Sequence, residues 1–517
     1  MKKREVMALA TEVYDENQLV ELEHAIDYAA DKHKGQKRKS GEPYITHPLS
    51  VAHTLIEWDM DIDSVLAGVL HDTVEDTDAT LEEIENMFGR DVAFLVDGVT
   101  KVSQARAGMR DLGSYLPQTK DNLSKLLIAV SQDVRVIIIK LADRLHNLST
   151  LQYMPKEKQQ KIARESLDVF APLADRLGMG RVRMQIEELA FSYLDPKEFK
   201  HLQSLVKKRL GKSTRKLGAV RLQIEQELKK QGIDFEVNGR VKSIYSLHKK
   251  LKKVDGNIDD VYDLMALRII VPDNESCYRV LGILHGMYQP MIARIKDYIA
   301  IPKPNGYQSL HTTVITPNEQ IVEFQIRTQL MHDYAERGLA ASFHYHEQKA
   351  TKAYTKNKSA AHLPAELQWI TQMQEVANRL REGEEITREQ LNVDLFGNRI
   401  FVYSPNGDIY NLPEGALPLD FAYLVHTDIG KHAYSFRVNG NIHAFDKPLS
   451  NGDMVEVITR KSVSPKSAWQ DLVTTGHARD KLRMQLRQLG LIQVISGAAA
   501  IIRDKAIRKK QKKESKT

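Results

Sequence analysis

The sequence has 517 residues, several times the usual length of one domain, so several domains are expected. Its 42% hydrophobic and 27% charged residues are typical of globular proteins and exclude collagen-like or wholly disordered chains. The net charge is +6, and the last fifteen residues, Arg503 to Thr517, alone carry eight basic and two acidic side chains. The rest of the chain is therefore net neutral, and the basic tail indicates either a local polyanion contact or a solvated terminus.

The composition also limits the site chemistry and the compartment. Cys277 is the single cysteine, which excludes a disulfide framework and a Cys-rich zinc module and fits a reducing cytoplasm. A bound metal would therefore use His and carboxylate ligands. The N-terminus lacks a sustained apolar region, and the run from Leu489 to Ile502 is too short to span a membrane. We expect a cytoplasmic protein with no membrane segment.

Hydrophobic periodicity divides the chain into helical and mixed parts. From Asn17 to about Leu194 apolar residues recur at helical spacing, which predicts a mostly α domain. A helical connector follows, with one apolar stripe made by Leu217, Val220, Ile224 and Leu228.

From Ile233 to about Glu347 the period changes. Strands are predicted at Leu267/Ile269/Val271 and Val322/Phe324/Ile326, and helices over Ser276–Met287 and Gln329–Ala341. This mixture indicates an α+β domain. After Phe396, short strands separated by PNGD, VNGN and SNGD turns predict a small β-rich module, and a helix is expected around Ala478–Leu489.

The first chemical signal is His71-Asp72 in GVLHDTVEDTD, followed by Glu75 and Asp76. On a helix, residues three and four apart share a face, so we expect these four side chains to converge on one patch. Imidazole with carboxylates suits manganese, iron or zinc, and open coordination positions suit water activation. The remaining candidate ligands are His47 in GEPYITHP and Asp143 in KLADRLHN.

The segments RKSGEPYITHP, GVLHDTVEDTD, DGVTK and VIIIKLADRLHNL, in that order, resemble the HD-type hydrolase domain of the RelA/SpoT homologues, the long-form alarmone enzymes. The resemblance implies Mn2+ held by His47, His71, Asp72 and Asp143, with Glu75 and Asp76 as the acid/base pair. It also implies nucleotide contacts from Arg38, Lys39, Asn147 and Thr150. The alternative for Arg38 and Lys39 is a solvated basic turn. His53 and His146 are not assigned as ligands, and His146 is interpreted as a packing or outer-sphere residue.

A second group of segments is rich in phosphate-binding side chains. GRVKSIYSLHKKL places Arg240, Lys242, Lys249 and Lys250 on a turn and the following helix, which suits a triphosphate or simply a solvated basic face. Two helical turns would put Lys242 and Lys249 on one side. VEFQIRT puts Glu323, Gln325 and Arg327 on one strand face by alternation, opposite Val322, Phe324 and Ile326. We expect this polar trio to face a cleft.

Together with YDLMALRIIV and KDYIAIPKPNGYQSLH, these segments resemble the synthetase domain of the same family, which transfers pyrophosphate from ATP to the 3′-hydroxyl of GDP or GTP. The resemblance implies Mg2+ bound by Asp263 and Glu323, with Glu323 also activating the 3′-hydroxyl. The implied ATP contacts are Arg240, Lys242, Ser243, Lys250 and Arg268. The implied GDP/GTP contacts are Lys303, Asn305, Tyr307, His311, Gln325 and Arg327, with Tyr307 stacked on guanine.

Two short segments refine this comparison. Arg294-Ile295-Lys296-Asp297 matches the Arg-X-Lys-Asp form seen in bifunctional members, whereas Ala341-Ser342-Phe343 departs from the usual Ala-His-Trp.

Residues 396–459 resemble a TGS domain, a small β-grasp module that contacts the tRNA acceptor end on the ribosome in long members. Long members continue into further regulatory modules, so we interpret the chain as shortened after this domain.

The expected organisation is multidomain: an all-α HD-type hydrolase domain, an α+β nucleotidyltransferase-like synthetase domain and a β-grasp TGS domain. The expected boundaries are 1–153 hydrolase, 154–232 helical connector, 233–347 synthetase, 348–392 helical linker, 393–460 TGS domain, and 461–517 helical segment and basic tail. The leading interpretation is a bifunctional (p)ppGpp synthetase and hydrolase of the stringent response. The alternatives are a hydrolase-dominant member with a weak synthetase, and a ribosome- or tRNA-binding regulator whose nucleotide sites are sensory.

Overall fold

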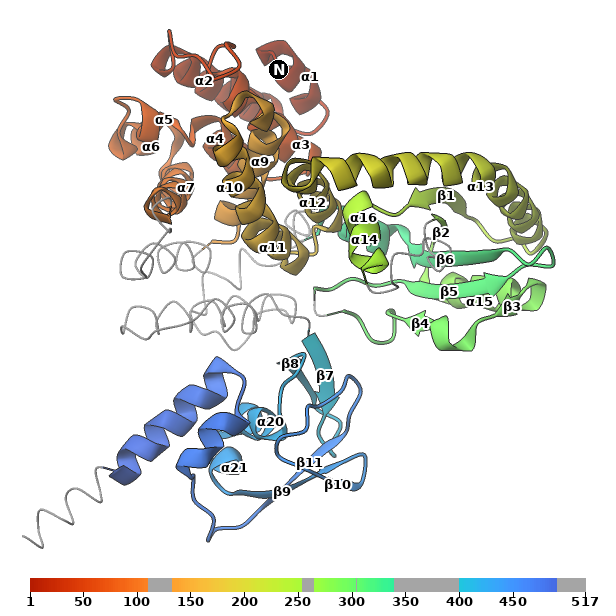
Figure 1. Ribbon diagram of the computed structural model, residues 1–517. Helices are drawn as coiled ribbons and strands as arrows, with labels where there is room; N and C mark the ends of the chain where they lie inside the picture. Colours follow the sequence, from red (N-terminus) through yellow and green to blue (C-terminus); the bar gives the residue numbers. More distant parts are fainter. Residues whose placement is uncertain (110–132, 253–264, 304, 339–398, 491–517) are drawn as a thin grey trace, which may run out of the picture. The chain divides into compact units, whose positions relative to one another are not determined.

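The computed structural model describes residues 1–109, 133–252, 265–303, 305–338 and 399–490 (Figure 1). The chain divides into two units, Met1–Gly383 and Glu384–Thr517. Several predicted features lie outside the described residues: Asp263, Ser342, Phe343, the linker 348–392 and the basic tail. Among the described helices, none has the length and apolarity needed to cross a membrane.

The predicted all-α domain is confirmed. Its helices are α1 (Lys3–Ala10), α2 (Glu16–Lys32), α3 (Thr46–Glu57), α4 (Ile62–Leu70), α5 (Thr73–Asp76), α6 (Leu81–Phe88), α7 (Arg90–Met109) and α9 (Arg135–Ser149). Asp61 caps the N-terminus of helix α4, because its carboxylate accepts a hydrogen bond from the backbone N–H of Ser64. Every residue from Ser64 to Leu70 is buried, and α4 packs against α2, α3, α7 and α9. At Gly68 an added Cβ would overlap Leu55 of α3, so α3 and α4 cross closely.

The helix predicted to carry the HD motif is interrupted. Helix α4 ends at Leu70, and a separate short helix, α5, begins at Thr73. The expectation that one face of a single helix carries His71, Asp72, Glu75 and Asp76 is therefore wrong. Side chains satisfy the carbonyls at the end of α4, because Nδ1 of His71 bonds to Gly68 O and the Thr73 hydroxyl donates to Leu70 O. His71 and Asp72 therefore lie at a junction between two helices.

The connector is helical, as predicted. It contains α10 (Lys156–Glu165), a π-helical turn (Ser166–Phe170), α11 (Ala171–Arg176), α12 (Gly180–Leu194) and α13 (Pro196–Lys230). The apolar stripe of α13, Leu217, Val220, Ile224 and Leu228, is buried in the same core as the strands that follow it. The last turns of α13 therefore pack as part of the α+β domain, although the sequence places them in the connector.

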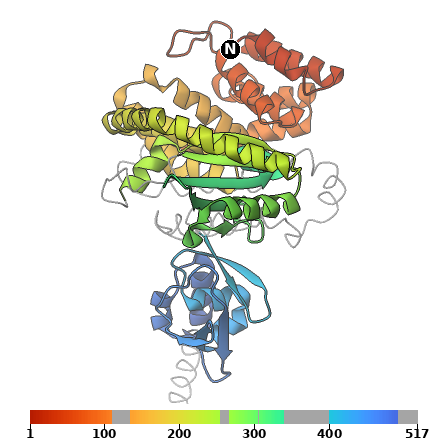
Figure 2. The same ribbon diagram turned by 90° about the vertical axis from the view of Figure 1, so that its right-hand side faces the viewer.

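The α+β domain is built on one mixed sheet, seen edge-on beneath α13 in Figure 2. Its strands are β1 (Glu236–Val241), β2 (Met265–Val271), β3 (Gln289–Pro290), β4 (Lys296–Asp297), β5 (Leu310–Ile315) and β6 (Ile321–Thr328), and its helices are α14 (Ile244–Leu251), α15 (Asn274–Met287) and α16 (Gln329–Arg337). The strand order is β1-β2-β6-β5-β3, with β4 paired to β5, and among the described strands of this sheet only β2 and β6 pair in parallel.

The predicted alternation of β6 is confirmed. Val322, Phe324 and Ile326 are buried in the core with side chains of α13 and α15. Because side chains alternate along a strand, Glu323, Gln325 and Arg327 lie on the other face of the sheet.

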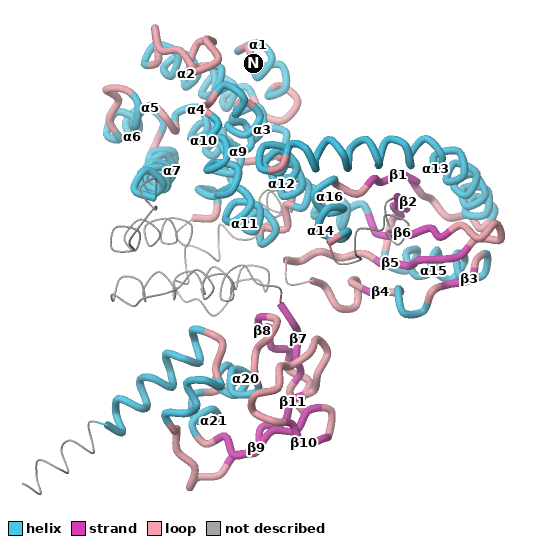
Figure 3. Tube along the Cα trace, viewed as in Figure 1, coloured by secondary structure: helices cyan, strands magenta, loops and turns pink. Residues whose placement is uncertain are grey.

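The second unit contains the predicted small β-rich module, with its strands shown in magenta in Figure 3. Its elements are β7 (Arg399–Tyr403), β8 (Ile409–Pro413), α20 (Pro418–Val425), α21 (Thr427–Lys431), β9 (Ala433–Val438), β10 (Asn441–His443), β11 (Val455–Thr459) and a helix over residues 476–490. The predicted β9–β10 turn is tight, since Asn439 and Gly440 both have positive φ. Buried Asp420 accepts hydrogen bonds from Thr474 and Thr475 and so ties α20 to the start of the last helix.

Gly338 closes a backbone contact between α16 and the turn before α12. Its φ is +63°, and a Cβ there would fall on Leu177 O and lie 2.6 Å from both Gly178 C and Met179 N. We expect Gly338→Ala to lower the free energy of unfolding by about 2 kcal/mol or more, because neither backbone can move away cheaply. Thermal and denaturant unfolding check this. Gly282→Ala, in the exposed middle of α15 with open space at the Cβ, is the control and should stabilise slightly.

Candidate active sites

Three buried side chains of the helical domain form a candidate metal centre. One ligand atom from each of His47, His71 and Asp143 lies within 4.8 Å of the others. Nδ1 of His71 bonds to Gly68 O at 2.9 Å, which directs Nε2 into the cluster. That Nε2 is buried, and its nearest carboxylate contact, Oδ1 of Asp72 at 3.1 Å, is an ion-pair contact without hydrogen-bond geometry. A buried nitrogen without a hydrogen-bond partner beside carboxylates fits a cation ligand, and the sequence prediction of a His/carboxylate site is confirmed to that extent.

Asp72 borders this cluster. Its Oδ1 lies 3.1 Å from Nε2 of His71, and its Oδ2 lies 3.5 Å from Nε2 of His47. Burial alone would lower the pKa of His71, but the charges of Asp72 and Asp143 outweigh burial and raise that pKa to about 8. Burial would raise the pKa of Asp143, but Lys140 and His47 hold it well below its usual range. The cluster therefore carries negative charge that attracts a proton or a cation.

Two residues near the cluster were not assigned from the sequence. Lys140 is buried, and its Nζ lies 2.5 Å from Oδ2 of Asp143, one helical turn away on α9. The Tyr44 hydroxyl lies 2.8 Å from Oδ2 of both Asp72 and Asp76 and donates its proton between them. Tyr44 thereby holds Asp76 beside the cluster, and both Asp76 and Glu75 are exposed residues of α5. Both residues lie inside the quoted motifs, but their contacts depend on the fold.

Arg38 is fixed against the end of α9. Its guanidinium donates to Nδ1 of His146 at 2.9 Å, to Oδ1 of Asn147 at 3.1 Å and to the Thr150 hydroxyl at 3.4 Å. The alternative of a solvated turn is therefore wrong for Arg38, while the exposed Lys39 agrees with it. The structure therefore brings Arg38, Asn147 and Thr150 together. Asn147 also donates a hydrogen bond to Asp143, which connects this group to the candidate metal centre.

The second candidate site lies on the polar face of the sheet. Strand register places His311 of β5 opposite Gln325, which is itself next to Arg268 of β2. Arg240 of β1 donates to Gln325 at 2.9 Å, and Gln325 donates to Oε1 of Glu323 at 3.3 Å. Nδ1 of His311 lies 3.4 Å from the same oxygen. These contacts therefore link four predicted site residues from strands β1, β5 and β6: Arg240, His311, Glu323 and Gln325.

The loop before β5 carries Tyr298, Lys303 and Tyr307, which together form an aromatic and cationic wall beside the sheet residues. The hydroxyl of Tyr307 and Nε2 of His311 are 2.9 Å apart. Nζ of Lys303 lies 4.7 Å from the Tyr298 ring centroid and 5.0 Å from that of Tyr307, and burial lowers the pKa of Lys303. Asn305 uses its amide to bond Asp175 O on α11 at 3.0 Å, so it also anchors the loop to the connector.

Arg268 and Arg327 converge on one acidic side chain of α16 that was not assigned from the sequence. They donate to Oε1 of Glu336 at 3.1 and 3.3 Å. Arg327 is almost fully buried, and burial with the neighbouring Arg268 lowers its pKa to about 10. Glu336 thus fixes the position of both arginines. The resemblance assigns Arg268 to ATP and Arg327 to GDP or GTP.

The basic segment after β1 differs from its prediction. Lys242 precedes α14, and Ser243 caps that helix by accepting a hydrogen bond from the Ser246 N–H. Lys249 pairs with Glu187 of α12 at 2.9 Å. The expectation that Lys242 and Lys249 share one helix face is therefore wrong, while Lys250 lies in the last turn of α14.

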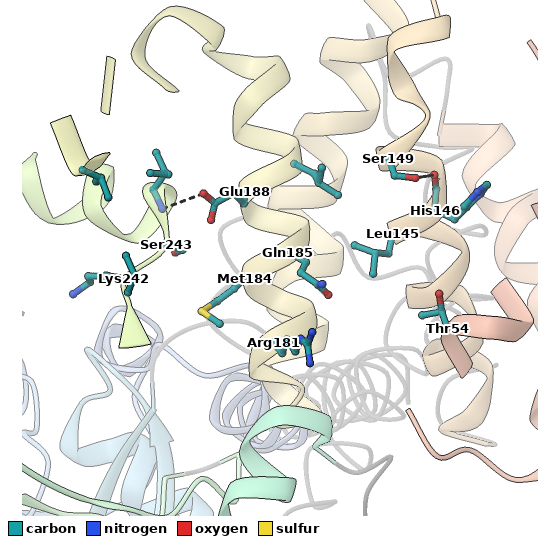
Figure 4. Close-up of a pocket in the computed structure, with 14 residues that line it drawn as sticks. Thr54, Leu145, His146, Ser149, Arg181, Met184, Gln185, Glu188, Lys242 and Ser243 are labelled. Carbon is teal, nitrogen blue, oxygen red and sulfur yellow. Dashed lines mark hydrogen bonds between the residues drawn. The ribbon is translucent and has the colours of Figure 1, made fainter. Parts of the chain in front are cut away.

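Helix α12 separates the two candidate sites. A cavity of about 710 Å3 borders it, and Figure 4 shows Lys242 and Ser243 on one side of the helix and Leu145, His146 and Ser149 on the other. Glu188 of α12 accepts a hydrogen bond from the N–H of Ile244 at 3.3 Å. The helix therefore contacts elements of both sites.

Comparisons with known proteins agree with this arrangement. An HD domain model matches residues 25–180, the "Region found in RelA / SpoT proteins" matches 239–350, and a TGS domain matches 400–459. The chain is 44% identical over 467 residues to a GTP pyrophosphokinase of Myxococcus xanthus, covering 90% of this chain and 60% of that protein.

Two further relatives are 41% identical. One is the bifunctional (p)ppGpp synthase/hydrolase SpoT of Escherichia coli, aligned over 474 residues that cover 92% of this chain and 66% of that protein. The other is a guanosine-3′,5′-bis(diphosphate) 3′-pyrophosphohydrolase of Aquifex aeolicus, aligned over 471 residues that cover 90% of this chain and 65% of that protein. The chain thus spans about 60 to 66% of the length of these relatives. With three matching domains in this order and this identity along nine-tenths of its length, the chain belongs to the RelA/SpoT family.

Proposed function

We propose that the chain is a bifunctional alarmone enzyme. One site transfers pyrophosphate from ATP to the 3′-hydroxyl of GDP or GTP and gives (p)ppGpp and AMP. The other hydrolyses (p)ppGpp to GDP or GTP and pyrophosphate. The observation that carries this proposal is the coexistence, in one chain, of the buried His47–His71–Asp143 cluster and the polar sheet face around Glu323. The names of the relatives, which cover both activities, support it.

In the proposed hydrolase site, different side chains bind the nucleotide, hold the metal and accept the proton. Arg38, held by Asn147 and Thr150, is positioned to bind the nucleotide. His47, His71, Asp72 and Asp143 would hold Mn2+, which when bound acidifies water and neutralises phosphate charge. Asp76, held beside Asp72 by Tyr44, is placed to accept a proton from the attacking water, with Glu75 as the second carboxylate. Water attacks the phosphorus on the 3′ oxygen, the bond between that phosphorus and the 3′ oxygen breaks, the 3′ oxygen takes up a proton, and pyrophosphate is released intact.

In the proposed synthetase site, Glu323 is the central group. Its carboxylate is oriented by Gln325 and His311 and is placed to accept the proton of the 3′-hydroxyl. Glu323 and Asp263 would hold Mg2+, which neutralises charge on the transferred phosphates. Arg240, Lys242, Ser243, Lys250 and Arg268 are assigned to ATP. Since AMP leaves, the 3′ oxygen attacks the β-phosphorus of ATP and the bond between the α- and β-phosphates breaks.

The acceptor nucleotide is assigned to the aromatic and cationic wall. Tyr307 would stack on guanine, and its hydroxyl contact with His311 fixes the ring beside Glu323. The remaining acceptor contacts assigned here are Lys303, Asn305, Gln325 and Arg327. The second unit is assigned to a tRNA or ribosome contact, which the TGS match supports.

The wild-type chain tests both activities in one experiment. We expect ATP, GDP and Mg2+ to give equal amounts of AMP and guanosine tetraphosphate, and added tetraphosphate with Mn2+ to give GDP and pyrophosphate, both measured by anion exchange. Hydrolysis without synthesis would replace the proposal by a hydrolase with a weak or inactive synthetase. Failure of both reactions, with nucleotides still bound, would favour a sensory regulator.

A further inference from the structure

A chain of hydrogen bonds joins the proposed nucleotide side of the hydrolase site to a proposed metal ligand. Nη1 of Arg38 lies 2.9 Å from Nδ1 of His146, and this same nitrogen lies 2.8 Å from Nδ1 of His47. On its other side, Nε2 of His47 lies 3.2 Å from Oδ1 of Asp143. The ring centroids of His47 and His146 are 4.9 Å apart. The proposed reaction assigns no role to His146, although it connects these groups.

The direction of each hydrogen bond follows from the chemistry of the groups. A guanidinium remains protonated and can only donate, so Nδ1 of His146 must accept from Arg38 and carries no proton. An unprotonated Nδ1 on His146 can make a hydrogen bond with Nδ1 of His47 only if His47 carries its proton there, so the one lone pair of this His146 nitrogen is shared between the Arg38 and His47 donors. The neutral His47 ring then has its free lone pair on Nε2, the atom that faces the carboxylates of Asp72 and Asp143.

We propose that His146 is a positioning residue that, held by Arg38, keeps the proton of His47 on Nδ1 and leaves Nε2 of His47 free to bind a divalent cation. In the opposite tautomer, an N–H group would point at the carboxylates and block the cation. This inference rests on the proposed metal centre and deepens it, because it adds a residue and fixes the tautomer of a ligand.

Binding of Mn2+ alone, without nucleotide, tests the proposal in the full chain. Free Mn2+ is measured by electron paramagnetic resonance during titration. His146→Phe keeps a ring but removes the acceptor, and we expect it to weaken Mn2+ binding by about 10- to 100-fold. In His146→Asn, Oδ1 can accept in place of Nδ1, so binding should recover most of this loss. His53→Phe is the matched control, because His53 pairs with Glu57 outside the cluster and should leave Mn2+ binding unchanged.

A second variant separates hydrogen-bond direction from simple charge. Arg38→Met removes a positive charge from the neighbourhood of the cation, so electrostatics alone predicts tighter Mn2+ binding. The proposal predicts weaker binding, because His146 is then free to carry its own proton on Nδ1. Lys37→Met removes one charge from an exposed position on the same loop and should not weaken binding.

The outcomes are distinct. Wild-type affinity in His146→Phe, an equal loss in His146→Asn and His146→Phe, or tighter binding in Arg38→Met would each overturn the role of His146. A wild-type chain that binds no Mn2+ would overturn the metal centre itself and this inference with it. Thermal unfolding of each variant checks that the domain is folded, and if His146→Phe does not fold, His146→Asn and Arg38→Met decide.

Discussion

Glu323→Gln is expected to lower the rate of AMP and guanosine tetraphosphate formation by about a hundred- to ten-thousandfold, the usual contribution of a general base. The amide keeps the size of the side chain and its contacts with Gln325 and His311, but it cannot accept the proton of the 3′-hydroxyl. The measurement is the initial rate with ATP, GDP and Mg2+. Hydrolysis of added tetraphosphate by the same preparation should be unchanged.

Glu319→Gln is the matched control for this variant. Glu319 is exposed on the turn that joins β5 to β6, so the same change of charge occurs in the same hairpin but away from the polar face. We expect wild-type synthesis from it. If Glu323→Gln kept more than a tenth of the wild-type rate, another group would have to accept the proton, and the assignment of Glu323 would be wrong.

His71→Ala is expected to reduce hydrolysis by about three orders of magnitude or more, since loss of bound metal removes several kcal/mol of charge stabilisation. His71 is a better target than Asp143, because removal of Asp143 would take away a counter-charge of the buried Lys140 and destabilise the fold. The measurement is pyrophosphate release from tetraphosphate. Synthesis by the same preparation reports that the chain is folded.

Metal removal and replacement complete this test. We expect EDTA to abolish hydrolysis by the wild-type chain and added Mn2+ to restore it, whereas Mn2+ should not restore His71→Ala. His53→Ala, in which a nearby imidazole outside the cluster is removed, should behave as wild type. Hydrolysis that survives both EDTA and His71→Ala would show that this cluster is not the catalytic centre.

The sequence patterns predicted those parts of the structure that depend on the backbone geometry of one strand or one turn. The alternation of Val322, Phe324 and Ile326 predicted both the buried face of β6 and the polar face that carries Glu323, because side-chain direction in a strand follows from its geometry. The Gly and Asn turns of the second unit were likewise predicted, since few residues tolerate positive φ.

Contacts between distant segments were not predictable in this way. The break between α4 and α5 depends on the His71 and Thr73 side chains bonding to backbone carbonyls, and helical spacing alone gave no sign of it. The arginine contacts of Glu336 join α16 to β2 and β6, so no spacing in the sequence reveals them. The position of His146 between Arg38 and His47 joins residues about a hundred positions apart, and only the packed helices bring them together.

The apolar stripe of α13 limits where recombination could divide the chain without damaging a hydrophobic core. Leu217, Val220, Ile224 and Leu228 supply core side chains to a sheet that begins only at Glu236. A recombination event that exchanged the α+β sheet but not the end of α13 would pack side chains from two different proteins in one core. Those side chains would not have evolved to fit each other. The end of the helix and the sheet therefore form one unit of exchange, and a viable crossover would fall before the stripe.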